Sequence, residues 1–219
     1  MSELIKSIFR EYDIRGIFPD ELNKDSIAKI AKSIAYKCLE ESIDEVVIAR
    51  DGRLSGPSLL ESLQKSLNAY GINTINLGLA TSPLLYYAAK KQVSKSGIMI
   101  TGSHNPKNYN GIKLVIDDKP VSGTEIFELS KTDISSGDSK GKNRFLDIKE
   151  DYINEVKNSF NFKKLKVVID CGNGAAGIIA PDLLRAVGCE LLKYSVMLTE
   201  FPNHHPDPGK KDLVDLIEK

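Results

Sequence analysis

Short apolar, β-branched runs alternate with amphipathic helical segments along most of this chain. Apolar residues at steps of three and four predict a helix from Ile27 to Leu39, and the run EVVIARD after it predicts a buried strand. The alternation continues with the segments SGPSLLESLQKSLNAYG, INTINLG, TSPLLYYAAKK and SGIMITG, in the order helix, strand, helix, strand. Because helices that connect strands pack on the faces of a sheet, we predict an α/β fold with a mixed, mostly parallel sheet covered by helices.

Proline and glycine mark the expected ends of two of these helices. Pro57 lies near the start of the second helix, and Gly71 lies just past its end. For the third helix we predict Ser82 as the N-cap, with Pro83 at the first helical position.

A polar segment then separates two units of the chain. Residues 131–143, KTDISSGDSKGKN, are rich in Ser, Gly and Lys and predict a linker. The alternation restarts with a helix near 148–160, followed by the strand LKVVID, a glycine-rich turn, a helix over 181–187, the strand CELLKYS, the loop FPNHHPDPG and the helical pattern KDLVDLIEK. We therefore predict a first domain over residues 1–143 and an incomplete second α/β domain over residues 144–219.

Composition and charge exclude several classes of protein. The chain is 41% hydrophobic, and its 30 basic residues balance 30 acidic ones, so no net charge would attract a nucleic acid. No apolar run approaches the roughly 20 residues of a membrane span. The three cysteines are far apart and form neither a disulfide framework nor a metal-ligand spacing. We expect a cytoplasmic protein that binds neither nucleic acid nor membrane.

The loops that follow the predicted strands carry the candidate functional groups. In an open α/β sheet, ligands bind beyond the carboxyl ends of the strands. Arg50, Asp51 and Arg53 lie in one such loop, and Ser103 and His104 lie in another. Arg50 and Asp51 have an alternative interpretation as a structural ion pair, and Ser103 as an ordinary turn residue.

A serine–histidine dyad is not implied by the sequence. Adjacent side chains in an extended loop point apart, and TGSHN lacks the second glycine of the G-x-S-x-G elbow. If Ser103 is a nucleophile, it needs a partner from elsewhere in the chain.

A set of motifs nevertheless resembles those of a known family. The segments FREYDIRG, ARDGRLSG, TGSHNP, YNGIK, DCGNGAAG and PNHHPDP occur in the order typical of the α-D-phosphohexomutases. Within that superfamily the chain is most similar to the phosphomannomutase/phosphoglucomutase group, and the resemblance extends over residues 9–208.

The resemblance implies a function for particular residues. In that family the serine of the TGSHNP loop, here Ser103, carries a phosphoryl group that it exchanges with hexose phosphates. Mannose or glucose 1-phosphate and 6-phosphate interconvert through a hexose 1,6-bisphosphate. Arg15 is expected beside the transferring phosphate, Lys113 as general acid or base, and His104 as a secondary proton-transfer group. Arg15, Asn105 and Lys113 are the expected substrate-binding residues.

The same resemblance implies Mg²⁺, with the phosphate of Ser103 as one ligand. The family's other ligands are aspartates of a D-x-D-x-D-R loop, and residues 1–219 contain no such loop. The loops that read the sugar and hold its distal phosphate in relatives are also missing, so we expect little or no mutase turnover from this polypeptide alone.

Alternative interpretations remain for the second unit and for the whole chain. Gly172, Gly174 and Gly177 form a G-x-G-x-x-G pattern between a strand and a helix, which is typical of NAD-binding Rossmann domains. The strand after it ends in Tyr194 and Ser195, however, without the acidic residue that holds the ribose. Two histidines in PNHHPDP are too few for a zinc site, and a connecting role is expected. A non-catalytic half-protein that binds a partner through an exposed sheet edge is the third hypothesis.

Overall fold

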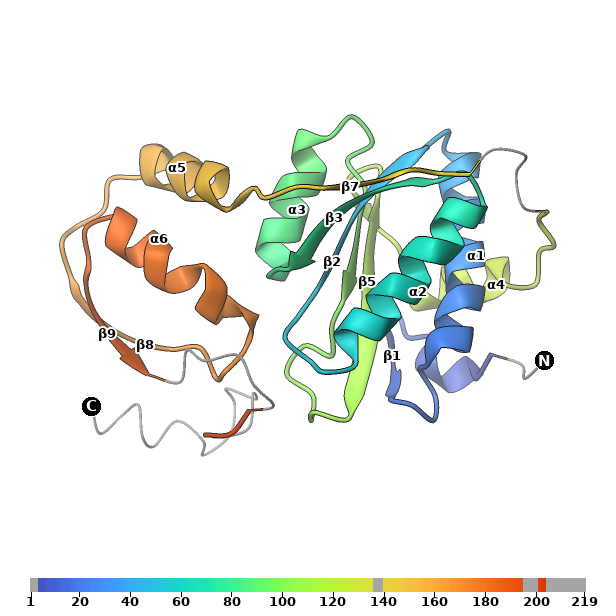
Figure 1. Cartoon of the computed structure of the whole chain (residues 1–219), viewed down its shortest axis with the longest axis horizontal. Helices are drawn as coiled ribbons and strands as arrows, with labels where there is room; N and C mark the ends of the chain where they lie inside the picture. Colours follow the sequence, from blue (N-terminus) through green and yellow to red (C-terminus); the bar gives the residue numbers. More distant parts are fainter. Residues whose placement is uncertain (1–3, 136–139, 195–200, 204–219) are drawn as a thin grey trace.

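A seven-stranded sheet forms the centre of the first unit (Figure 1). The structure is a computed structural model that describes residues 4–135, 140–194 and 201–203. The strand order is β1-β5-β4-β2-β3-β7, with β6 paired to β5. The strands are β1 (Ile14–Ile17), β2 (Glu45–Arg50), β3 (Asn73–Leu79), β4 (Gly97–Ile100), β5 (Tyr109–Ile116), β6 (Lys119–Pro120) and β7 (Asn143–Phe145).

Helices cover both faces of this sheet (Figure 1). On one face lie α1 (Lys24–Glu40), α2 (Gly56–Ala69) and the short α4 (Gly123–Leu129), and on the other lies α3 (Ser82–Lys91). Side chains of β2 alternate between the two cores: Ile48 packs with α1 and α2, whereas Ala49 packs with α3. Both side chains are fully buried, as expected for a central strand with helices on both faces.

The pairing of the strands confirms the predicted α/β fold class. β4, β2, β3 and β7 are parallel, whereas β5 runs antiparallel to both β4 and β1. β5 reverses because residues 101–108, which connect it to β4, contain no helix that could carry the chain back across the sheet. This connection is the TGSHNP loop, and it therefore leaves and re-enters the same edge of the sheet.

The helix ends agree with the sequence except at α3. Pro57 lies in the first turn of α2, and Gly71 follows that helix with a φ of 85°. The N-cap of α3 is Thr81 and not Ser82, so that prediction is wrong. Thr81 has extended backbone and its hydroxyl accepts from the N–H of Leu84 at 3.3 Å, whereas Ser82 is already helical.

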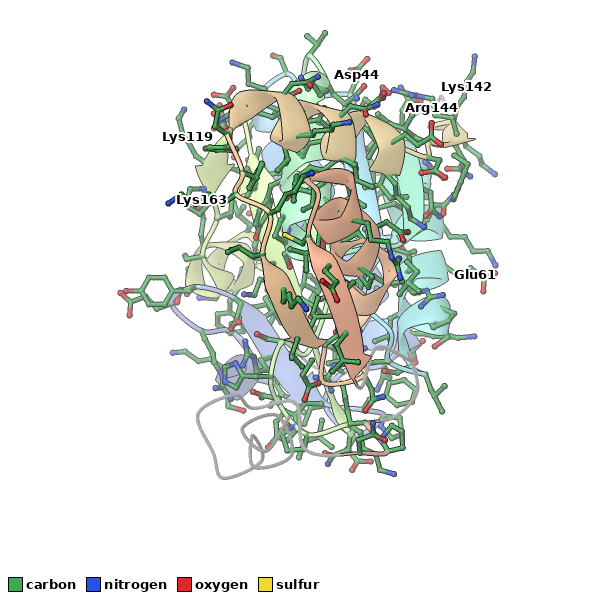
Figure 2. All side chains as sticks on the ribbon, turned by 90° about the vertical axis from the view of Figure 1, so that its left-hand side faces the viewer. Asp44, Glu61, Lys119, Lys142, Arg144 and Lys163 are labelled. Carbon is green, nitrogen blue, oxygen red and sulfur yellow. The ribbon has the colours of Figure 1, made fainter. Side chains whose placement is uncertain are left out.

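A smaller unit follows β7. It consists of α5 (Lys149–Ser159), β8 (Lys166–Asp170), a 3₁₀ turn over Ala175–Ile178, α6 (Ala180–Ala186) and β9 (Glu190–Tyr194). β8 and β9 are parallel. Figure 2 shows the two strands from the side on which none of the described helices covers them. Val168 and Leu192 pair on neighbouring strands and are 37% and 57% exposed. The predicted FPNHHPDPG loop from residue 204 and the helical pattern at 211–219 lie outside the described residues.

The two units contact each other through α3 and α5. The rings of Tyr87 and Tyr152 meet edge to face, with 5.2 Å between their centroids. The hydroxyl of Tyr87 and the ammonium of Lys91 both donate to the carboxylate of Glu155, at 2.9 and 2.6 Å. Ile179 of the second unit is buried in the same core as α3. These contacts place the glycine-rich turn after β8 opposite the carboxyl edge of the main sheet.

The capping geometry of α3 gives a first test. Replacing Thr81 by Ala removes the hydroxyl that accepts from Leu84 and should lower the free energy of unfolding by about 1 kcal/mol. Replacing Ser82 by Ala removes no cap and should change it by less than about 0.5 kcal/mol. Urea denaturation of both variants decides between the two residues, and an equal or larger loss from Ser82→Ala would contradict the assignment.

Candidate active site

Loops from the carboxyl edge of the sheet surround one cavity. Its volume is about 600 Å³, which is typical of sites for small molecules. The loops after β2, β3 and β4 line one side of it, and the turn over residues 171–176 and Phe201 line the other. Ser103 and His104 both face this cavity. The candidate site therefore lies where an open α/β sheet places its ligands.

Ser103 has an unusual backbone conformation. Its φ is 55°, in the left-handed region that residues with a Cβ seldom adopt. The turn is closed by a hydrogen bond from the N–H of Asn105 to the carbonyl of Gly102, at 3.0 Å. This bend brings the Ser103 hydroxyl to 3.4 Å from Nδ1 of His104. The expectation that the two side chains point apart is therefore wrong, because it assumed an extended loop.

The buried guanidinium of Arg53 holds this loop from beneath. Its side chain is only 1% exposed. It donates to four main-chain carbonyls, those of Ser103 (3.0 Å), Asn105 (2.8 Å), Pro106 (2.6 Å) and Tyr109 (2.9 Å). The planar guanidinium can reach several acceptors at once because its five N–H groups fan out in fixed directions.

Asp51 completes the support of the loop. Its carboxylate accepts from the hydroxyl of Thr101 at 2.7 Å, from the N–H of Gly102 at 3.3 Å and from Nε of Arg53 at 3.2 Å. Burial lowers the pKa of Arg53 while the charge of Asp51 raises it. We call Asp51 and Arg53 the loop clamp.

The alternative interpretation of Arg50 and Asp51 as an ion pair is wrong, because Asp51 pairs with Arg53 and not with Arg50. Arg50 donates to the main-chain carbonyl of Asp51 at 2.9 Å, and the ion pair is formed with Arg53. Arg53 was among the candidate groups predicted from the sequence, but its function in holding the loop was not predicted. The signal was an aspartate and an arginine two residues apart, directly after a central strand.

Gly102 allows the loop to lie close to the clamp. A Cβ added at Gly102 would lie 2.4 Å from Cζ of Arg53, well inside van der Waals contact. A side chain at this position would therefore require the guanidinium to move.

Arg15 approaches the same loop from β1. The strand pairs with β5, with Arg15 opposite Gly111. Its Nη1 donates to the side-chain carbonyl of Asn105 at 2.8 Å, and its Nη2 pairs with Asp13. Nε of Arg15 is buried and has no hydrogen-bond partner among the described residues. Such a group is costly to leave unpaired, so Arg15 retains a donor for a ligand that binds at the loop.

Lys113 lies on β5, outside the loop that carries Ser103. It is on β5 directly opposite Met99, which lines the cavity. Residues opposite each other in an antiparallel pair share a face, so Lys113 is on the cavity side of the sheet. Its own side chain does not line the cavity. The structure therefore brings Ser103 and His104 together, with Asn105 in the same loop and Arg15 bound to Asn105. None of Arg15, Asn105 and Lys113 is among the residues that line the cavity, and Lys113 also lies outside the loop.

The glycine-rich turn forms the wall opposite Ser103. Gly172 and Asn173 both have a φ of 54°, and the N–H of Gly172 donates to the carboxylate of Asp170 at 2.7 Å. The ring of Phe201 lies over the guanidinium of Arg53, 5.4 Å from its Cζ. The second unit thus closes the cavity over the loop clamp.

The expected Mg²⁺ was tested against the donors around the loop. Within residues 4–135, 140–194 and 201–203, no three His, Cys, Asp or Glu side chains cluster as a metal site would require. Asp51, the acidic residue in the cavity wall, is already bound to Arg53 and Thr101. The described residues alone therefore do not form a complete Mg²⁺ site.

Comparison with known proteins shows which family has this arrangement. Residues 6–132 match domain I, and residues 150–219 match domain II, of the sequence models described as phosphoglucomutase/phosphomannomutase α/β/α domains. The phosphomannomutase/phosphoglucomutase of Pseudomonas syringae pv. tomato is 44% identical over 97% of this chain. The phosphoglucomutase of Neisseria meningitidis serogroup A is 39% identical over 99% of it.

A solved structure agrees with these relatives. A phosphoglucomutase/phosphomannomutase family protein from Burkholderia thailandensis superposes with a TM-score of 0.92 and 33% identity, over 99% of this chain and 50% of that one. The chain spans about half the length of the curated relatives it matches, 47% for the Pseudomonas syringae protein. Neither the NAD-binding alternative nor the non-catalytic one is supported by these matches.

The conformation of Ser103 gives a test by unfolding. Ser103→Gly should be more stable than Ser103→Ala by about 1 kcal/mol, because glycine adopts a φ of 55° without the cost that a Cβ incurs. Both variants lack the hydroxyl, so the comparison isolates the backbone.

The matched pair of variants is at Ser62, a half-buried residue of α2 whose hydroxyl donates to the carbonyl of Lys24 at 2.8 Å and is lost in both variants. There the order should reverse, with Ser62→Ala more stable than Ser62→Gly by about 1 kcal/mol, as in any helix interior. The interpretation fails if urea unfolding ranks Ser103→Ala above Ser103→Gly.

Proposed function

The chain belongs to the phosphoglucomutase/phosphomannomutase family, and on that premise we propose that Ser103 carries a phosphoryl group and exchanges it with hexose phosphates. The observation that carries the proposal is the exposed Ser103 hydroxyl on the cavity wall, 3.4 Å from an imidazole nitrogen, on a loop that two arginines contact. In the proposed reaction, hexose 1-phosphate and hexose 6-phosphate interconvert through a hexose 1,6-bisphosphate.

The transfer step exchanges one P–O bond for another. A sugar hydroxyl attacks the phosphorus of phosphoserine, the bond from phosphorus to Oγ of Ser103 breaks, and the sugar proton passes to a base. Oγ of Ser103 then takes up a proton. His104 is near enough to exchange this proton with Oγ. Lys113, on the cavity side of β5, is the proposed base for the sugar hydroxyl once a bound sugar reaches it.

Charge at the loop suits a phosphorylated serine. Phosphoserine carries about −1.5 to −2 charges at neutral pH and three strong acceptor oxygens. Arg15 supplies a cation and an unused buried N–H, and it is tied through Asn105 to the loop of Ser103. Phosphoryl transfer depends mainly on positioning and on neutralising this charge, so we assign Arg15 to the phosphate and Asn105 to its orientation.

The proposal includes Mg²⁺, with the phosphate of Ser103 as one of its ligands. When bound, such an ion neutralises phosphate charge. The rest of its coordination must come from outside the described residues, which lack an acidic cluster.

The partners and location follow from the proposed activity. Substrates are hexose phosphates and a hexose bisphosphate, and preference between mannose and glucose is left open. The helices that the structure describes include none suited to crossing a bilayer. We place the protein in the cytoplasm, where its free thiols stay reduced.

Phosphorylation of the protein tests this proposal directly. Incubation of the chain with glucose 1,6-bisphosphate and Mg²⁺ should add one phosphoryl group, which peptide mass spectrometry should locate at Ser103. Ser103→Ala should abolish the modification, because it removes the hydroxyl that lies 3.4 Å from Nδ1 of His104. Ser62→Ala, which removes a hydroxyl on α2 that donates to the carbonyl of Lys24, should leave the modification unchanged. Modification that survives Ser103→Ala would move the nucleophile elsewhere, and no modification of the unaltered chain would reject the proposal for this polypeptide.

A further inference from the structure

A buried arginine lies beneath the serine loop, in the wall of the cavity. The Arg53 guanidinium contacts four carbonyls of residues 103–109 and the carboxylate of Asp51. Burying a charge is costly, and a loop of this length can be held by neutral hydrogen bonds alone. The position of this cation directly beneath Ser103 therefore calls for a functional explanation.

The contacts of Arg53 set the direction of the loop's peptide groups. Across a peptide bond, a carbonyl and the following N–H point opposite ways. Since the carbonyl of Ser103 points at Arg53, the N–H of His104 points away from it. Within the described part of the chain, no acceptor takes that N–H. The guanidinium thus holds the carbonyl of Ser103 toward the protein interior and leaves the N–H of His104 directed away from it. An unpaired N–H next to Ser103 favours the binding of an anion there.

The clamp also fixes the left-handed bend at Ser103. That conformation is unfavourable for serine, so surrounding contacts must impose it. The carbonyl of Ser103 accepts a hydrogen bond from Arg53 at 3.0 Å. The N–H of Ser103 donates to Oγ1 of Thr101 at 2.9 Å. Thr101 is in turn bound by Asp51. Both peptide groups of Ser103 are therefore held by the clamp, one directly and one through Thr101.

We propose that Arg53 is a positioning residue for phosphoserine: it holds the loop so that the phosphate on Ser103 occupies one fixed place on the cavity wall, next to the N–H of His104. The inference rests on the proposed function of Ser103. Arg53 acts through the main chain of the loop and does not touch the phosphate. Lysine cannot replace it, because one ammonium group cannot reach four separated carbonyls and a carboxylate together.

The test places phosphoserine at position 103 during translation, so that no transfer reaction is needed. ³¹P NMR at about pH 8.5, where phosphoserine is a dianion because its second pKa is about 6, reports the surroundings of the phosphate. We expect one narrow resonance, shifted from that of the same chain unfolded in urea. In Arg53→Lys the resonance should move to the unfolded position while the amide and methyl spectra of the core stay folded.

Chemical rescue separates positioning from general stabilisation. Arg53 lines the cavity, and Arg53→Ala removes from it the atoms from Cγ to the guanidinium, which correspond to ethylguanidinium. Millimolar ethylguanidinium should return the ³¹P resonance of Arg53→Ala to its native position, and ethylammonium should not. The matched control is Arg144→Lys, which changes a half-exposed arginine on β7, the edge strand of the main sheet, and should leave the resonance unchanged (Figure 2).

Each other outcome rejects the proposal. A native resonance in folded Arg53→Lys or Arg53→Ala would show that the phosphate does not depend on Arg53. Failure of ethylguanidinium to restore it, or unfolding of both variants, would show a purely structural role. The proposed function is tested separately, because the phosphoserine here is installed and not acquired from a hexose bisphosphate. If the chain takes no phosphoryl group from a hexose bisphosphate but gives the expected ³¹P results, the proposed phosphoryl transfer is rejected and the positioning by Arg53 stands.

Discussion

The hydrogen bonds from one buried guanidinium to the carbonyls of the serine loop are the interaction on which the candidate site depends. A loop that carries a reactive hydroxyl must be exposed at its tip and still hold one conformation. Arg53 provides this by binding the loop from the protein side, where water does not compete. Asp51 balances its charge and reaches the start of the loop through Thr101 and Gly102. The exposed face of the loop is left free for a ligand.

The topology of the sheet explains why this loop and this clamp meet. β2 and β4 are parallel neighbours, so the residues after each strand emerge at the same edge. Asp51 and Arg53 follow β2, and Thr101 to Ser103 follow β4. The antiparallel return of β5 then anchors the far end of the loop, and β1 beside β5 delivers Arg15 to Asn105. The site is thus assembled from four neighbouring strands with few long connections.

Sequence patterns anticipated the elements of this fold but not their fine geometry. The spacing of apolar residues and the positions of turn residues predicted where the helices and strands lie. The spacing is informative because a helix or strand that buries one face, or both, has apolar residues at regular steps. The cap of α3 was misplaced by one residue, because Thr81 and Ser82 are both good capping residues. The positive φ of Ser103 was also missed, because it is imposed by Asp51 and Arg53, which are distant in the chain. The motif resemblance named the candidate residues, whereas the hydrogen bonds of Arg53 became visible only in three dimensions.

The most direct measurement is a crystal structure of the chain with phosphoserine at position 103. The account predicts that Arg53 keeps its contacts with the loop carbonyls. A phosphate oxygen should lie within about 3 Å of the N–H of His104, and the unused Nε of Arg15 should turn to the same phosphate. A phosphate directed into bulk solvent, with Arg53 withdrawn from the loop and Nε of Arg15 still unpaired, would contradict the central claim that this clamp prepares Ser103 for a phosphoryl group.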